Sequence, residues 1–135
     1  MSWRESLIRI TNYEVETLQK RLGEIVGRRQ DAQMRLTMLE AQVVAEMEHA
    51  NRDASLGFGW QGFLAGMKHR RERIDLEIRD IEQEEAGARD ALSDAFESLK
   101  KFEHVAEIAR LAGVKEADKR ETAAMDEIGL RVASR

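Results

Sequence analysis

Two long tracks of apolar residues, spaced alternately four and three positions apart, constrain this chain more than any other feature of its sequence. This alternation is the a/d seam of a left-handed coiled coil. No proline interrupts either track, and proline is the residue that most strongly breaks a helix. The first track consists of Ile8, Thr11, Val15, Leu18, Leu22, Ile25, Arg29, Ala32, Leu36, Leu39 and Val43, and the second of Met67, Arg71, Ile74, Ile78, Ile81, Glu85, Ala88, Leu92, Ala95, Leu99, Phe102, Ala106 and Ala109.

The break between the two tracks is rich in glycine, which lets the chain reverse. Glycine is a poor helix former and adopts left-handed backbone easily, so it ends helices and forms turns. We therefore predict an all-α fold, a two-helix antiparallel coiled-coil hairpin with a C-terminal helical overhang, as a single domain over residues 1–135. Helix one should cover about residues 3–51, the tip 52–62 and helix two 63–132. The tip residues are Gly57, Phe58, Gly59, Trp60, Gly62 and Phe63, whose aromatic rings, with Leu64, should fold over the open end of the seam.

Residues 57–62 read G-F-G-W-Q-G, which also matches the G-x-G-x-x-G pattern of dinucleotide-binding turns. Such a turn needs a buried strand before it and an acidic residue on a second strand about 20 positions later. Both flanks have helical spacing here. The match therefore does not predict a nucleotide site.

Composition gives no support to catalysis, metal binding or nucleic-acid binding. Charged residues make up 36% of the chain and aromatic residues 5%, with a net charge of −4 and no cysteine. A pair of helices offers no desolvated cleft in which carboxylates would gain acid–base function. The histidines, His49, His69 and His104, do not supply the converging ligands of a zinc site. We expect no enzyme activity, no cofactor, no metal and no nucleic-acid partner, and we interpret the basic run at 68–73 as a solvated face.

Arg29 and Glu85 interrupt the two apolar tracks at equivalent heptad positions. A hairpin that reverses near residue 57 places them opposite each other as a register pair. A polar pair inside a seam typically costs stability while it fixes the alignment of the helices. Alternatively, each side chain extends to water and its stem covers the seam. The sequence does not decide between the two.

The same alignment brings the glycines of helix one, Gly23 and Gly27, level with Ala91 and Gly87 of helix two. Glycine inside a helix costs about 1 kcal/mol relative to alanine, so this layer should be the softest part of the hairpin. It is either a bend point or, as we favour, a tolerated weak spot on the solvent face.

An apolar stripe at helical spacing is also present beyond the residues that helix one can cover. In the predicted register Trp3 lies near Leu111, so the chain beyond Ala112 has no partner on helix one. An uncovered apolar stripe usually marks a partner surface, and a frayed or folded-back tail is the alternative. We predict that this overhang and the adjacent N-terminus bind a partner protein. The stripe consists of Val114, Ala117, Ala124, Met125, Ile128 and Val132.

Two stretches of the sequence resemble the flagellar FliJ family. The stretch F-G-W-Q-G-F-L-A-G-M-K-H-R-R-E-R-I is similar to the middle of FliJ proteins, where an aromatic residue is followed by F-L and a helical run. The closing stretch K-R-E-T-A-A-M-D-E-I-G resembles their C-terminal pattern of a glutamate, a gap and an Asp-Glu pair, here Glu121, Asp126 and Glu127. Length and two-helix plan agree over essentially the whole chain, but helix one carries no family-specific signature.

The resemblance implies a non-enzymatic component of flagellar type III protein export, similar to the γ-subunit stalk of rotary ATPases. Such proteins engage the hexameric export ATPase FliI, contact the export gate FlhA and help recycle export chaperones. The implied location is the cytoplasm, at the inner face of the membrane near the flagellar base, with membrane association through partners only. Apolar residues should supply buried contact with the ATPase, and acidic residues should meet basic groups that line its ring. The predicted partner-binding residues are Trp3, Leu7, Glu121, Met125, Asp126, Glu127 and Ile128.

Two other functions fit the sequence. One is a membrane-interface adaptor, in which the aromatic tip enters the lipid interface while Arg70, Arg71 and Arg73 face the headgroups. The other is a structural coiled coil in which two copies pair through their seams.

Overall fold

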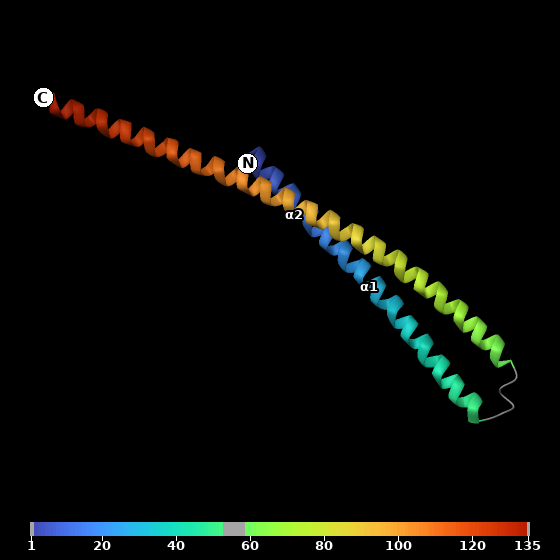
Figure 1. Ribbon diagram of the computed structural model, residues 1–135. Helices are drawn as coiled ribbons and strands as arrows, with labels where there is room; N and C mark the ends of the chain where they lie inside the picture. The colour runs from blue at the N-terminus through green and yellow to red at the C-terminus, as the bar shows by residue number, and fades with distance from the viewer. Residues whose placement is uncertain (1, 53–58, 135) are drawn as a thin grey trace. The chain divides into compact units, whose positions relative to one another are not determined.

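The structure, a computed structural model, describes residues 2–52 and 59–134. These residues form two α-helices and no β-strand: α1 (Trp3–Arg52) and α2 (Trp60–Ala133). Figure 1 shows the two helices side by side and running in opposite directions. The predicted helical hairpin is confirmed. Gly57 and Phe58 of the predicted tip lie outside the described residues.

Helix α2 begins at Trp60, earlier than the predicted start near residue 63. Gly59 adopts a positive φ of 87°, which glycine tolerates because it lacks a Cβ atom. Its carbonyl accepts a hydrogen bond from the Phe63 N–H at 3.0 Å, so helical bonding starts there. Gly62 consequently lies within the first turn of α2 and not in the reversal, which corrects the predicted helix boundary. The other boundary is close to the prediction, with α1 ending at Arg52.

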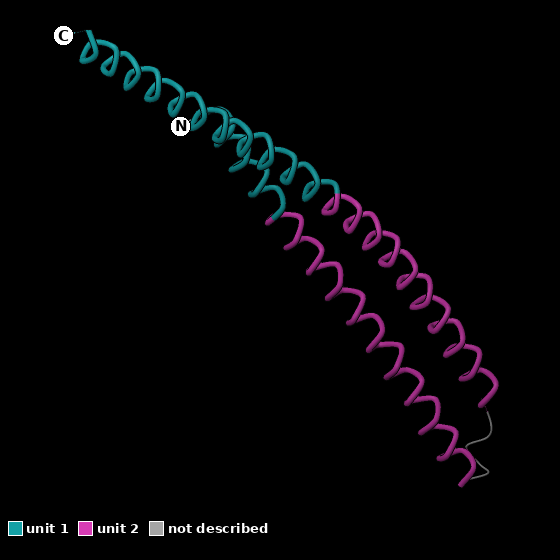
Figure 2. Tube along the Cα trace, turned by 60° about the vertical axis from the view of Figure 1, so that its left-hand side comes forward, with its two compact units in different colours: residues 1–15, 94–135 teal, residues 16–93 magenta. Residues whose placement is uncertain are grey.

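The chain divides into two compact units, which Figure 2 shows in magenta and teal. The first contains residues 16–93, and the second contains residues 1–15 together with 94–135. We describe each unit separately. The description of the chain as a single domain stays a prediction.

The unit of residues 16–93 is held together by the predicted apolar tracks. Its core cluster is Ile25, Ala32, Ile78, Ile81 and Ala88, with Leu22, Leu36 and Ile74 packed against it. All of these residues lie on the two tracks, so the seam is filled within one chain. The alternative in which two copies pair through their seams stays a hypothesis.

Ion pairs between the helices flank this core. Arg28 contacts Glu84 at 3.0 Å, Arg35 contacts Glu77 at 2.6 Å, and Arg71 contacts Glu40 at 3.4 Å. Residue numbers rise on α1 as they fall on α2 from one pair to the next, as antiparallel pairing requires. Because all six side chains are largely exposed, each pair contributes about 0–1 kcal/mol and supports the alignment more than the stability.

The unit of residues 1–15 and 94–135 has a smaller buried seam. Val15, Ala95 and Leu99 are buried here. Thr11 is also buried, and its hydroxyl donates to the Leu7 carbonyl one turn earlier at 2.8 Å. The polar group is thus satisfied inside its own helix and adds no unpaired donor to the seam.

Neither described helix contains a segment that is long and apolar enough to span a membrane.

Candidate functional site

Residues 110–134, which we call the C-terminal segment, are all exposed. Helix α2 nevertheless continues through them as far as Ala133. The helix does not end where its buried seam ends, since the last half-buried position of the seam is Ala109. A helix of this length is marginal in water on its own, so a long helix with no packed side raises the question of what covers it.

Large apolar side chains in the C-terminal segment are open to solvent. Met125 is 64% exposed, Ile128 is 55% exposed and Val132 is 65% exposed. Their spacing, together with that of Val114, places them along one face of a helix with 3.6 residues per turn. Single exposed apolar residues are normal on protein surfaces, but a continuous stripe marks a surface that binds something.

The three acidic residues of the segment differ in their surroundings. Glu127 accepts a hydrogen bond from Arg131 Nη2 at 3.0 Å, within the same helix face. Glu121 and Asp126 form no ion pair with any described residue. Helical spacing puts Glu121 one turn before Met125, on the apolar face, whereas Asp126 and Glu127 lie more than about 90° away from the centre of that face. The acidic groups therefore do not form one cluster, and Glu121 is the one of the three that lies on the stripe.

The N-terminal end of α1 lies within the same unit as the C-terminal segment. Ser2 Oγ accepts a hydrogen bond from the Glu5 N–H at 3.2 Å, which is one half of a capping box and fixes the helix start. The Arg4 guanidinium lies over the Trp3 ring, 4.9 Å from its centre, and 65% of Trp3 is exposed. A small hollow at this end is lined by Trp3, Arg4, Leu7, Phe102 and Val105.

Leu7 is half-buried against α2 in this hollow, so it contributes to the hairpin as well as to any binding surface. Trp3 is the residue at this end with free area for a partner. The prediction that both residues bind a partner stays a prediction.

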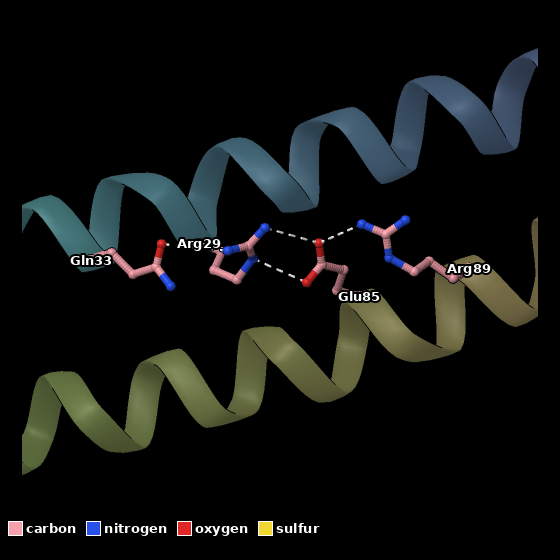
Figure 3. Close-up of polar contacts among 4 residues, drawn as sticks. All are labelled: Arg29, Gln33, Glu85 and Arg89. Atoms are coloured by element: carbon pink, nitrogen blue, oxygen red, sulfur yellow. Dashed lines mark hydrogen bonds and ion pairs between the residues drawn. The ribbon is translucent and has the colours of Figure 1, made fainter.

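Figure 3 shows Arg29 and Glu85 facing each other from α1 and α2. Arg29 Nη2 donates to Glu85 Oε1 at 3.3 Å, and Arg29 Nε lies 3.0 Å from Oε2. The second contact is an ion pair without the alignment of a hydrogen bond. Both side chains are mostly covered, at 25% and 12% exposed. Gln33 accepts a long hydrogen bond from Arg29 Nη1 at 3.4 Å.

A third charged residue, Arg89, completes this site. It donates to Glu85 Oε1 at 3.1 Å from one turn further along α2. Partial burial is the largest influence on the pKa of Glu85 and works to raise it, but the hydrogen bonds from Arg89 and Arg29 and their charges outweigh it. The pKa of Glu85 therefore lies below its ordinary value, and the group is a carboxylate at neutral pH. Sequence reasoning missed Arg89, although its i,i+4 spacing from Glu85 was the available signal.

At the hairpin tip, Trp60 and Phe63 stack on each other. Their ring centres are 5.2 Å apart, with an angle of 24° between the planes, and both residues are half-buried. The next residue, Leu64, lines a hollow of about 340 Å³ between α1 and α2 together with Leu39, Val43 and Met67. The two rings cover part of each other's surface, which leaves less of it for a lipid interface. The membrane-interface function of the tip stays a hypothesis.

Metal-ligating side chains do not converge in the described residues, where no group of three or more His, Asp or Glu could hold an ion. Sequence reasoning also missed an exposed apolar residue of the C-terminal segment, Leu130, which is 72% exposed. Its position does not fit the stripe of Met125 and Ile128, because helical spacing places it on the opposite side.

Comparisons with known proteins bear on the whole chain. The family model described as the flagellar FliJ protein matches residues 5–135. Flagellar FliJ proteins from two strains of Caulobacter vibrioides are each 52% identical over 132 residues, which is 98% of this chain and 95% of the relative. The chain belongs to the FliJ family. No solved structure matches it.

Family membership confirms the resemblance and extends it to α1. The sequence of α1 showed generic coiled-coil spacing and no family signature, yet the family match covers α1 from residue 5 to its end. The family name identifies a flagellar protein.

Proposed function

We propose that this chain is a non-enzymatic component of the flagellar type III protein export apparatus and binds the export ATPase FliI through its C-terminal segment. The export gate FlhA and the export chaperones are further partners. Membership of the FliJ family supports the apparatus, and the exposed apolar stripe supports the segment. In this proposal the chain acts at the cytoplasmic side of the membrane near the flagellar base and reaches the membrane through its partners.

The observation that carries the proposal is the full exposure of residues 110–134 in a helix that keeps its apolar stripe. Burial of such a stripe gives roughly 25 cal/mol for each Å² of apolar surface removed from water. A side chain the size of Met125 or Ile128 therefore gains about 1.5–3 kcal/mol when a partner covers it fully. Nothing within the described chain provides that cover, so the gain is available to a partner protein.

Glu121 places a negative charge on the stripe itself. Glu121 and Asp126 have no cationic partner among the described residues, and Glu127 is held only by the exposed Arg131. A ring lined with basic groups would complement Glu121 directly, and Asp126 and Glu127 only through the wider field of the ring. Complementary charges raise the association rate and select the partner more than they raise affinity, so the apolar contacts should carry most of the binding energy.

The direct test is a double substitution, Met125→Glu with Ile128→Glu, in the full-length chain. It places charges on the apolar stripe and should weaken binding to purified FliI by at least about 100-fold, as expected for the loss of two central anchors. The matched control is Leu130→Glu, on the opposite face of the same helix, which should change affinity less than about threefold. Equal effects of the two changes would contradict a one-sided contact.

Truncation after Ala112 tests the segment as a whole. The truncated chain should keep the thermal unfolding of the hairpin and should lose FliI binding and swimming motility. A truncated chain that binds FliI with full affinity would place the contact on the paired helices or the tip, and would overturn the proposal.

A further inference from the structure

The basic run at residues 68–73 divides between two hollows of the hairpin. Lys68 and Arg71 line the hollow of about 340 Å³ near the tip. Arg70 and Arg73 line a second hollow, of about 490 Å³. The run is exposed throughout, as expected, but its charges are directed to two different places.

The second hollow, which we call the arginine groove, lies between α1 and α2 within the unit of residues 16–93. Part of its lining is apolar. Leu39 is buried and Ile74 is half-buried there, while 65% of Met38 is exposed. The groove therefore offers apolar surface and cations together, which suits a ligand that carries both apolar and anionic groups.

Two of the arginines in the groove have no partner within the described chain. Arg35 donates to Glu77 at 2.6 Å, so this pair is neutral. Arg70 and Arg73 form no ion pair with any residue that the structure describes. Helical spacing places both on the same side of α2 as Glu77. Three arginines and one glutamate line the groove, which leaves two positive charges on a chain whose net charge is −4.

The positive stretch of the groove is short. Asp80 lies one turn after Glu77 on the same side of α2, and Asp31 lies one turn before Arg35 on α1. The surface therefore becomes acidic farther from the tip. From Arg70 to Glu77 the helix covers about 10 Å. A partner should consequently contact the groove with a short segment of its chain.

We propose that the arginine groove binds a short acidic segment of a partner protein. Carboxylates of the segment pair with Arg70 and Arg73, and an apolar side chain between them covers Ile74 and Met38. Arginine suits this task because its guanidinium group can form two parallel hydrogen bonds with one carboxylate. The apolar contact then adds affinity that charge alone would not supply.

Other anions fit the groove less well. Inorganic phosphate would pair with the arginines but would gain nothing from the apolar lining. A lipid surface is flat, and a groove between two helices does not match its shape. A nucleic acid presents a row of phosphates, and it would meet the carboxylates of Glu77 and Asp80 on either side of the same helical turn.

A labelled peptide tests the chemistry of the groove. Fluorescence anisotropy of a fluorescein-labelled peptide that repeats Glu-Glu-Leu, titrated with the full-length chain, should give a dissociation constant between about 10 µM and 1 mM, because the contact is small. The same peptide with serine in place of leucine should bind at least about fivefold more weakly. Equal binding of these two peptides would overturn the apolar contact. Absence of binding by the Glu-Glu-Leu peptide at every concentration would overturn the whole proposal.

Charge reversal locates the binding site. Arg70→Glu and Arg73→Glu should each weaken binding of the Glu-Glu-Leu peptide by about 10-fold. The matched control is Arg79→Glu, which changes the net charge equally on the opposite side of α2 from Arg70 and should change binding less than about twofold. All three residues are exposed, so the variants should fold normally. Equal losses in the three variants would overturn the proposal, because the overall charge of the chain would then explain the binding.

Exchanged charges and competitors sharpen the test. The double variant Arg70→Glu with Arg73→Glu should bind a Lys-Lys-Leu peptide, which the original chain should not bind. Vesicles of phosphatidylglycerol should leave the Glu-Glu-Leu peptide bound, and inorganic phosphate should displace it no better than chloride at the same ionic strength. Displacement by the vesicles would overturn the proposal and assign the groove to a membrane surface.

The proposal goes beyond the proposed function, because the groove leaves the C-terminal segment free. Arg70→Glu with Arg73→Glu should keep full affinity for FliI. Met125→Glu with Ile128→Glu should keep full affinity for the Glu-Glu-Leu peptide. The two proposals can therefore fail separately. In cells, Arg70→Glu with Arg73→Glu should reduce swimming motility, whereas Arg79→Glu should not, and unchanged motility in the double variant would overturn a role for the groove.

Discussion

The seam of residues 16–93 and the C-terminal segment are built from the same spacing of apolar residues, and they differ in what covers them. In the seam, Ile25, Ile78 and Ile81 are buried against the opposite helix. In the C-terminal segment, Met125 and Ile128 follow the same periodicity and are more than half exposed. Helix α2 contributes to both regions without a break.

The comparison shows that the same spacing of apolar residues can serve either the stability of the fold or the binding of a partner. Heptad spacing specifies which face of a helix is apolar, but the presence of a partner decides whether that face stabilises the fold or remains available for binding. Stability should therefore be concentrated in the seam, and binding should be concentrated where the seam has no second helix. The predictions below test this division, in order of expected size.

The largest expected difference is between two isoleucines of α2. Ile81 is 4% exposed in the seam, and Ile128 is 55% exposed in the C-terminal segment. Ile81→Ala should lower the free energy of unfolding by about 2–4 kcal/mol, because it removes buried methyl groups and leaves a cavity. Ile128→Ala should change it by less than about 0.5 kcal/mol. Denaturant unfolding measures both, and equal losses would mean that the segment is packed in solution.

Glycine substitutions sharpen the same comparison. A Cβ atom added at Gly23 or Gly27 meets nothing within 4 Å, so alanine fits without strain. Each Gly→Ala change should raise the free energy of unfolding by about 1 kcal/mol, through better helix propensity. Gly113→Ala, in the C-terminal segment, should leave the unfolding of the hairpin unchanged, which serves as the control.

Hydrogen exchange gives a second readout of the glycine layer. Amides at residues 22–30 should exchange faster than those at 36–43 if the glycines soften α1. Equal exchange rates in the two stretches would show that this part of the helix is as stable as its neighbours.

The register pair Arg29–Glu85 lies inside the seam, and its coupling energy can be compared with that of a pair at the edge of the seam. A double-mutant cycle of Arg29→Leu and Glu85→Leu should give a coupling energy of about 1 kcal/mol, because both groups are mostly covered and in contact. The exposed pair Arg28–Glu84 should give at most about 0.5 kcal/mol in the same cycle. A coupling energy below about 0.5 kcal/mol for Arg29–Glu85 would mean that their stems cover the seam while their charges do not interact.

Low pH should weaken the seam slightly, because it protonates the carboxylate of Glu85. The pKa of Glu85 is lowered in the folded chain, because hydrogen bonds from Arg89 and Arg29 outweigh the effect of burial. The pKa of Glu77 is lowered by its hydrogen bond from Arg35. A lowered folded-state pKa gives stability that is present above the unfolded-state pKa, about 4.3 for glutamate, and is lost as the pH falls through the folded-state value.

The melting temperature should therefore fall as the pH drops below about 4.3. Glu85→Gln should make that fall shallower, because the substituted side chain does not titrate. A variant with the same pH dependence as the original chain would show that Glu85 does not contribute to it.

The sequence predicted the hairpin because heptad spacing directly reports which side of each helix is apolar. All of the buried core cluster, from Ile25 to Ala88, was on the predicted tracks. The start of α2 was predicted less well. The preference of Gly62 against helix is only about 1 kcal/mol, and helical bonding from Gly59 overrides it.

The candidate sites, like the fold, were predicted from the sequence only in part. Arg29 and Glu85 could be located from spacing alone, but the contribution of Arg89 depends on the direction of its side chain. Around Met125, the sequence grouped Glu121, Asp126 and Glu127 by their order in the chain, whereas the helix distributes them over different sides.

Hydrogen–deuterium exchange of the full-length chain, alone and with saturating FliI, tests the central claim most directly. In the free chain, amides of residues 113–133 should exchange far faster than those of the seam at residues 22–43 and 74–92. On addition of FliI, the C-terminal segment should become protected by at least about 10-fold, while the seam changes little. Protection confined to residues 16–93, with a C-terminal segment that exchanges as fast as before, would contradict the account.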